Sequence, residues 1–155
     1  MALEDAIRRI RSVADYQFGR GVGVKLFPKN VEIICSKRTG RIRYVYLKGE
    51  RLVTVRPTDG LLSLSIAGAK RIVKRAKYRV TVQNNVAEFI IKGGDVFAKH
   101  VVRANKNIRP KDEVIVVDEN SEVLAVGRAV LSGDEMEAFK SGVAVKVRRG
   151  LLEES

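Results

Sequence analysis

The chain has 155 residues, 45% of them hydrophobic, with three prolines and one cysteine, a composition that fits one large or two small domains folded throughout. The single cysteine excludes an internal disulfide, and no apolar run approaches the ~20 residues that span a bilayer, so we expect a cytoplasmic protein with no membrane partner. The 30 lysines and arginines against 18 aspartates and glutamates give a net charge of +12, which favours a polyanionic partner over an acidic protein or a small metabolite.

The first predicted element is an amphipathic helix over residues 3–15. Its apolar side chains recur at spacings of four, three and four, as expected for a helix that buries one stripe, at Leu3, Ile7, Ile10 and Ala14. Three glycines follow at residues 19, 21 and 23, but no strand precedes them and no Gly-Lys-Ser/Thr follows, so a nucleotide-binding loop is disfavoured. A flexible loop is the expected structure there.

From residue 31 the apolar period changes to two and predicts an antiparallel meander. Its strands are expected at residues 31–35, 41–47, 51–56 and 61–65. In the second strand Arg41 and Arg43 share one face, whereas the other face carries Ile42, Tyr44 and Tyr46. We therefore expect one side of the sheet to be core and the other to be a basic surface.

Two further features belong to this first half. Cys35 lies in an apolar run, which is typical of a small core residue. Residues 67–76 combine apolar and basic side chains and predict a short basic helix that closes the first domain near Lys77.

Residues 78–150 predict a small, nearly closed β-barrel, because closure removes the exposed edges that an open sheet would leave. Strands are expected at residues 78–82, 96–102, 114–117, 123–131 and 143–147, with short helices at 86–91 and 132–139. The second helix begins with the Ser-x-x-Glu pattern of a capping box at Ser132 and Glu135. The predicted fold class is α+β: an antiparallel sheet with flanking helices over residues 1–77, a pseudo-barrel over 78–150, and a tail over 151–155.

The positive charge is confined to the first half. Residues 1–77 hold 18 basic and 6 acidic side chains, net +12, whereas residues 78–155 hold 12 of each. A thermophile-type surface is the alternative explanation, but such surfaces pair both signs in networks, and acidic residues are scarce here. The distribution favours nucleic-acid binding by residues 1–77.

Groups suited to catalysis are few. His100 is the only histidine and Cys35 the only cysteine, so neither a zinc site nor a structural zinc cluster can be built, and no serine lies in a Gly-x-Ser-x-Gly context. The carboxylate pairs Asp112-Glu113 and Asp118-Glu119 fall in predicted turns, where solvated side chains are expected. We predict no catalytic residue, no metal and no cofactor.

The segment from Lys92 to His100 places Gly93 and Gly94 at a helix-to-strand junction. Missing side chains would let a sugar-phosphate backbone approach the main chain there, with Lys99 in reach of a phosphate. The same glycines also suffice to stop the preceding helix. Their spacing does not separate the two interpretations.

Three segments of the second half carry a family resemblance: GGDVFAKHVV at 93–102, IRPKDEVIVVDENSEVLAVGRAVLS at 108–132 and EMEAFKSGVAVKVRRG at 135–150. Together they resemble the PUA domain, the RNA-binding pseudo-barrel of pseudouridine synthases and archaeosine transglycosylases. Three segments of the first half, ADYQFGRGVGVKLF at 14–27, SKRTGRIRYVYLKGERLVTVRPTDGLLSL at 36–64 and IAGAKRI at 66–72, are similar to the region that precedes the PUA domain in archaeal tRNA-guanine transglycosylase.

The resemblance implies a detached counterpart of the C-terminal part of that enzyme, whose PUA domain engages the acceptor-stem end of tRNA. The enzyme's catalytic TIM barrel needs about 250 residues. Neither that barrel nor its zinc-binding cysteine cluster is found in this sequence. The resemblance therefore implies a non-catalytic protein that binds tRNA by shape and phosphate contacts. A variant of this hypothesis adds a separate catalytic transglycosylase subunit as partner.

The resemblance also implies a set of RNA-binding residues: Gly93, Gly94, Asp95, Val96, Phe97, Ala98, Lys99, His100, Arg128, Lys146 and Arg148. Charge alone adds candidates in the first half: Arg38, Arg41, Arg43, Lys70, Arg71 and Lys74. An alternative function is that of a ribosome- or translation-associated PUA factor that binds rRNA, and an enzyme with an unrecognised active site is a third class.

Overall fold

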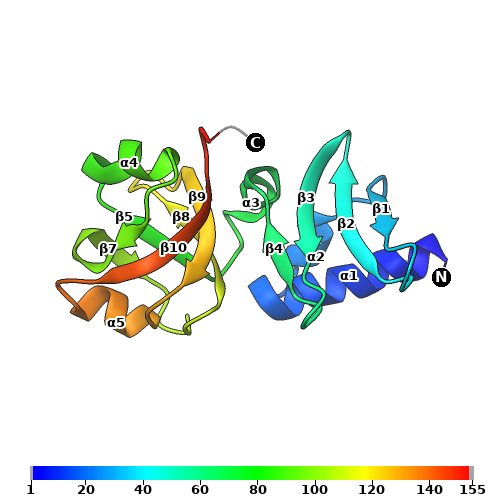
Figure 1. Cartoon of the computed structure of the whole chain (residues 1–155), viewed down its shortest axis with the longest axis horizontal. Helices are drawn as coiled ribbons and strands as arrows, with labels where there is room; N and C mark the ends of the chain where they lie inside the picture. Colours follow the sequence, from blue (N-terminus) through cyan, green and yellow to red (C-terminus); the bar gives the residue numbers. More distant parts are fainter. Residues whose placement is uncertain (1, 154–155) are drawn as a thin grey trace. The chain divides into compact units, whose positions relative to one another are not determined.

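The structure, a computed structural model, describes residues 2–153 and forms two units, Met1–Ala76 and Lys77–Ser155, called unit 1 and unit 2 below (Figure 1). Unit 1 holds a four-stranded antiparallel sheet with helices, and unit 2 holds a six-stranded mixed sheet that curls into a pseudo-barrel. The predicted α+β fold class is confirmed. None of the helices in the described residues is long and apolar enough to cross a membrane.

Helix α1 spans Leu3–Phe18 and confirms the first predicted element. It buries Ile7, Ile10 and Ala14 of the apolar stripe read from the sequence, leaves Leu3 exposed, and extends the stripe by one turn to Phe18, which is 1% exposed. Glu4 and Asp5 in the first turn suit the positive end of the helix dipole. The predicted stripe therefore decides which face of α1 packs.

The glycine segment after α1 is not the flexible loop that we expected. Helix α2, Val22–Leu26, begins immediately after Gly21 and packs against α1. A Cβ on Gly23 would lie 2.3 Å from the carbonyl oxygen of Arg11, and the Gly23 N–H donates to the Asp15 carboxylate at 2.6 Å. The glycine is needed for close helix packing, which spacing along the sequence cannot reveal.

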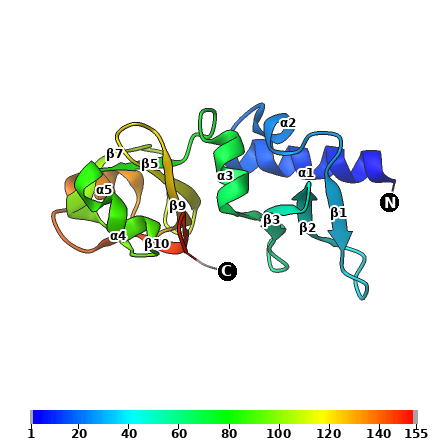
Figure 2. The ribbon, with the colours of Figure 1, turned by 90° about the horizontal axis from the view of Figure 1, so that it is seen from above.

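The predicted meander is confirmed as strands β1 (Glu32–Cys35), β2 (Ile42–Leu47), β3 (Glu50–Val55) and β4 (Leu62–Leu64), paired in that order. Helix α1 lies across one face of this sheet (Figure 2). The buried Gln17 joins the two, because its amide accepts from the Leu62 N–H and donates to the Leu62 carbonyl, both at 2.8 Å. Helix α3, Ile66–Ile72, follows β4 and is capped by Ser65, whose side chain accepts from the Gly68 N–H.

One side of β2 packs in the core at Val45. Val45 is fully buried and pairs with the fully buried Val53, whereas Tyr44 and Tyr46 are half-buried, so the core side of β2 is centred on Val45 rather than on the tyrosines. The pairing with β1 shifts register between Tyr44 and Ile42, so the alternation of β2 does not extend to Arg41 and Arg43, which are both exposed. Cys35 is also exposed rather than buried, because β1 is the edge strand of the sheet.

Unit 2 contains β5 (Arg79–Val82), β6 (Val96–Phe97), β7 (Val101–Ala104), β8 (Glu113–Val117), β9 (Val123–Ala129) and β10 (Val143–Gly150), in the spatial order β6-β10-β9-β8-β5-β7. All neighbours are antiparallel except β5 and β8. Helix α4 spans Ala87–Ile91 after a 3-10 turn at Asn84–Val86, and α5 spans Gly133–Ala138. The predicted capping box at Ser132 and Glu135 is present.

The strand expected at 96–102 is broken by a 3-10 turn, η2, at Ala98–His100. This turn joins the edge strands β6 and β7: the Ala98 N–H donates to Gly142, and the His100 carbonyl accepts from Gln83. The break thus brings the two sheet edges together. At the other end of the unit, the N–H groups of Leu151 and Leu152 donate to Leu124 and Ile91, so residues 151–152 pack on the pseudo-barrel.

Candidate nucleic-acid interface

Unit 1 carries a groove of about 870 Å³ between α1 and two hairpin loops. The loops, residues 36–41 and 56–61, connect β1 to β2 and β3 to β4, so they lie at the same end of the antiparallel meander. Five arginines line the groove: Arg9, Arg38, Arg41, Arg43 and Arg56. Three of them were predicted from charge, and the structure brings these three together.

Opposing negative charge is scarce in this groove. Among the described residues that line it, Asp59 is the only carboxylate. Its Oδ1 lies 3.3 Å from the Arg56 Nε, close enough for an ion pair, yet the geometry gives Nε no hydrogen bond. The guanidinium carbon of Arg43 lies 5.4 Å from the ring centroid of Tyr44, within cation–π range. The groove is therefore suited to an anion.

The remaining candidates of unit 1 lie on or after α3 and do not line the groove. Lys70 and Lys74 are exposed, and the Arg71 Nε donates to the Lys25 carbonyl at 3.1 Å. Lys70 and Arg71 occupy the last turn of α3, where positive charge suits the helix dipole. Their contact with RNA stays a prediction.

The two glycines at the predicted RNA face of unit 2 are covered by side chains of the same unit. A Cβ on Gly94 would lie 2.2 Å from the Phe89 ring, and one on Gly93 would lie 2.6 Å from the Glu153 carboxyl carbon. Gly93 has φ 103°, which a residue with a side chain rarely adopts. An RNA backbone could reach these glycines only after the Phe89 and Glu153 side chains move.

Several other predicted residues of unit 2 have structural partners. Asp95 accepts a hydrogen bond from the Val147 N–H at 2.9 Å and pairs with the Lys146 ammonium at 3.3 Å. Its carboxylate therefore ties the start of β6 to β10. Lys146 also faces Arg128 across the β9–β10 pair, and both are exposed.

Arg148 makes a bidentate ion pair with Glu113, whose side chain is completely buried. Glu113 lies in β8 rather than in a solvated turn, so the expectation for this carboxylate was wrong. The Arg148 side chain is 36% exposed, and its guanidinium compensates the charge of the buried carboxylate. This arginine therefore stabilises unit 2, whatever it contributes to RNA.

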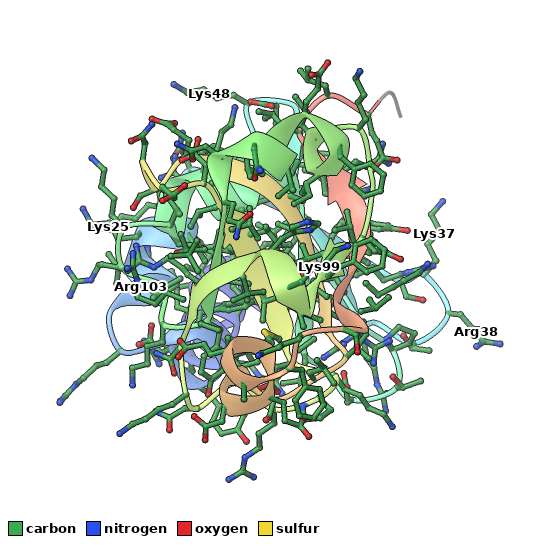
Figure 3. All side chains as sticks on the ribbon, turned by 90° about the vertical axis from the view of Figure 1, so that its left-hand side faces the viewer. Lys25, Lys37, Arg38, Lys48, Lys99 and Arg103 are labelled. Carbon is green, nitrogen blue, oxygen red and sulfur yellow. The ribbon has the colours of Figure 1, made fainter. Side chains whose placement is uncertain are left out.

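Residues 96–100 divide into buried and exposed positions. Val96 and Ala98 belong to the core, so only their main chain could contact RNA. Phe97 is 36% exposed and its ring meets that of His100 edge to face at 6.4 Å. Lys99 and Arg103 of β7 are both exposed, and they lie apart from each other in Figure 3.

Sequence reasoning missed three exposed or groove-lining arginines: Arg9, Arg56 and Arg103. Arg9 and Val13 are four residues apart on α1 and both line the groove, so helical spacing could have linked Arg9 to this site. Within residues 2–153 no three histidine, cysteine, aspartate or glutamate side chains gather in a way that could hold a metal ion.

Comparison with known proteins assigns a family to each part of the sequence. Residues 8–79 match the patch-forming domain C2 of tRNA-guanine transglycosylase, and residues 78–151 match the PUA domain. The tRNA-guanine(15) transglycosylase of Pyrococcus furiosus is 50% identical over 153 residues, which cover 97% of this chain and 26% of the relative. The chain spans about a quarter of the length of the curated relatives it matches.

Two solved structures share the fold of both units. A hypothetical protein of Pyrococcus horikoshii superposes with a TM-score of 0.77 at 22% identity, covering 99% of this chain and 94% of that one. A conserved PUA domain protein of Thermoplasma acidophilum superposes with a TM-score of 0.69 at 22% identity, covering 99% and 93%. At this identity the two structures show the fold alone.

The pseudo-barrel and the family match define the class of the second unit: residues 78–151 match the PUA domain. Across both units its sequence resembles the C-terminal part of archaeal tRNA-guanine transglycosylase, the region preceding the PUA domain together with the PUA domain itself. The resemblance recognised in the sequence is thus confirmed.

Proposed function

We propose that this protein binds structured RNA, specifically the acceptor-stem end of tRNA, by shape and phosphate contacts. The observation that carries the proposal is the arginine groove of unit 1, which is lined by five arginines and one carboxylate, in a chain whose other half matches the PUA domain. Arginine binds phosphate oxygens through a planar set of N–H donors and stays charged at all physiological pH values. Such a surface attracts polyanions.

The choice of tRNA rests on the relatives. The curated proteins that match nearly the whole chain are named tRNA-guanine(15) transglycosylases. Helical RNA is read mainly through its backbone and 2′-hydroxyl groups, because its deep major groove is closed to side chains. A surface of exposed basic side chains suits contacts to the RNA backbone better than readout of base edges.

We assign base exchange to a different polypeptide. The relatives that match nearly the whole chain are named tRNA-guanine(15) transglycosylases, and we propose a separate catalytic transglycosylase subunit as the partner of this protein. The present chain would then dock the tRNA. We expect a barrel-sized subunit to copurify with this chain, and we expect base exchange from the two proteins together but from neither alone. Full activity of the barrel without this chain would contradict the proposal.

The direct test is filter binding of the full chain to deacylated tRNA, the same tRNA without its 3′ CCA, and a duplex RNA of matched length, at two salt concentrations. We expect intact tRNA to bind most tightly, and affinity to fall with salt by a log-log slope of about −0.9 per neutralised phosphate. Equal binding of all three RNAs would exclude acceptor-end recognition and favour a ribosomal RNA ligand. A slope of zero would exclude the electrostatic account.

A further inference from the structure

The two hairpin loops that flank the groove of unit 1 have the same backbone structure. In each, the N–H of the glycine donates to the carbonyl of the first residue, at 2.8 Å in loop 36–41 and 2.9 Å in loop 56–61. The N–H of the first residue donates to the carbonyl of the last at 2.8 Å in both. The glycine φ angles are 73° and 74°. The groove is thus walled by twin turns, 20 residues apart in the sequence.

The twin turns differ in charge at one equivalent position. In loop 36–41 the Thr39 hydroxyl accepts from the Arg41 N–H at 3.2 Å, and in loop 56–61 the Asp59 carboxylate accepts from the Leu61 N–H at 2.9 Å. A hydroxyl and a carboxylate therefore support the same turn. The charge at this position can change while the backbone bond is kept.

Asp59 acts on the arginines as well as on its own turn. The Arg56 Nε is a buried donor without a hydrogen bond, and it lies 3.3 Å from the Asp59 carboxylate. The Arg56 side chain is 18% exposed, and an anion that enters the groove would interact with its guanidinium. Asp59 competes with that anion, because it places a negative charge beside the same guanidinium.

We propose that this groove holds a phosphate group of an RNA strand together with its attached nucleoside, and that Asp59 is a built-in competitor that weakens the site. The inference rests on the proposed RNA-binding function and names the part of unit 1 that performs it. A volume of about 870 Å³ far exceeds a phosphate ion and falls in the range of small-molecule pockets. The apolar walls supplied by Ile10, Val13 and Val55 suit a sugar and a base beside the phosphate.

Two substitutions at the equivalent positions test the proposal in opposite directions. Asp59→Asn keeps an amide oxygen for the Leu61 N–H and removes the charge, so intact tRNA should bind roughly two- to fivefold more tightly. Thr39→Asp keeps an acceptor for the Arg41 N–H and adds a charge, so tRNA should bind roughly two- to fivefold more weakly. Filter binding of the full chain at low salt measures both.

Matched controls make the same charge changes in unit 1 outside the groove. Glu50→Gln lies at the opposite end of the meander, and Asn30→Asp lies in the exposed turn before β1. Both controls should change tRNA affinity by less than about twofold. Unchanged circular dichroism and melting temperature should accompany all four variants, since each turn bond is retained.

A second readout separates this site from the proposed function. In an NMR titration of the full chain with inorganic phosphate, the amide signals of Gly40 and Gly60 should shift saturably, and Thr39→Asp should reduce the shifts. If the wild-type chain binds no tRNA, the RNA function fails, and saturable phosphate shifts would still support the anion site. If tRNA binds but neither Asp59→Asn nor Thr39→Asp differs from its control, the proposed site is overturned, with or without phosphate shifts.

Discussion

The two units use their basic side chains in different ways. In unit 1 five arginines and a single carboxylate line the groove, and Arg38 and Arg41 are exposed without an ion pair in the described part of the chain. In unit 2 Arg148 is committed to the buried Glu113, and Lys146 is paired with Asp95. The number of basic residues in a unit therefore does not by itself measure its capacity to bind RNA. The intramolecular partners of those residues must be known first.

The largest expected effect tests whether Arg148 is structural. Arg148→Ala leaves the carboxylate of Glu113, which is 0% exposed, without its bidentate partner. We expect the free energy of unfolding to fall by about 2–4 kcal/mol, somewhat below the full penalty for a buried pair because Arg148 itself is partly exposed. Urea denaturation followed by circular dichroism measures it.

Lys146→Ala is the matched control for this prediction. Its partner Asp95 is 24% exposed and retains the hydrogen bond from the Val147 N–H. Loss of the Lys146 side chain should lower the free energy of unfolding by less than about 1 kcal/mol. Equal urea midpoints for the two variants would refute the structural role of Arg148.

The next effect concerns which unit carries the salt dependence of RNA binding. Replacing Arg38, Arg41 and Arg43 by glutamine should weaken tRNA binding by roughly tenfold or more and flatten the log-log salt slope by about 0.9 per lost phosphate contact. The same loss of three charges in unit 2, at Lys99, Arg128 and Lys146, should weaken binding by roughly threefold, since Lys146 is already paired with Asp95. A larger loss of tRNA affinity in the unit 2 variant than in the unit 1 variant would mean that unit 2 contributes more to RNA binding.

The smallest expected effect on tRNA affinity concerns the two glycines of unit 2, Gly93 and Gly94. The Glu153 carboxylate covers Gly93 and accepts a hydrogen bond from the Gly150 N–H at 2.6 Å. Glu153→Gln keeps the size of the side chain and the acceptor but removes a charge that would repel phosphate. We expect tRNA affinity to rise by about twofold in filter binding.

Glu122→Gln, an exposed carboxylate elsewhere in unit 2, supplies the control for that charge change. It should leave tRNA affinity within experimental error of the wild-type value. If Glu153→Gln behaves in the same way, the RNA backbone does not approach Gly93, and the two glycines serve only to stop α4 and accommodate their neighbours.

Local patterns predicted most of the fold. The stripe of α1, the period-two strands of the meander and the capping box of α5 each depend on residues a few positions apart, and all three are present. The errors arose where distant segments meet. The 2.3 Å approach of a Gly23 Cβ to Arg11 requires α2 to pack on α1, and the covered face of β2 depends on where α1 lies.

The same distinction between local pattern and tertiary contact applies to the candidate site. The sequence by itself determined the α+β class, the resemblance to the PUA domain and the confinement of positive charge to residues 1–77, because these follow from composition and local pattern. Only the tertiary structure decided which basic residues face open space. The partners of Arg148 and Lys146 are 35 and 51 residues away, and the groove joins residues of a helix with two separate loops. Electrostatic pairing depends on distance in space, which the order of residues along the chain does not specify.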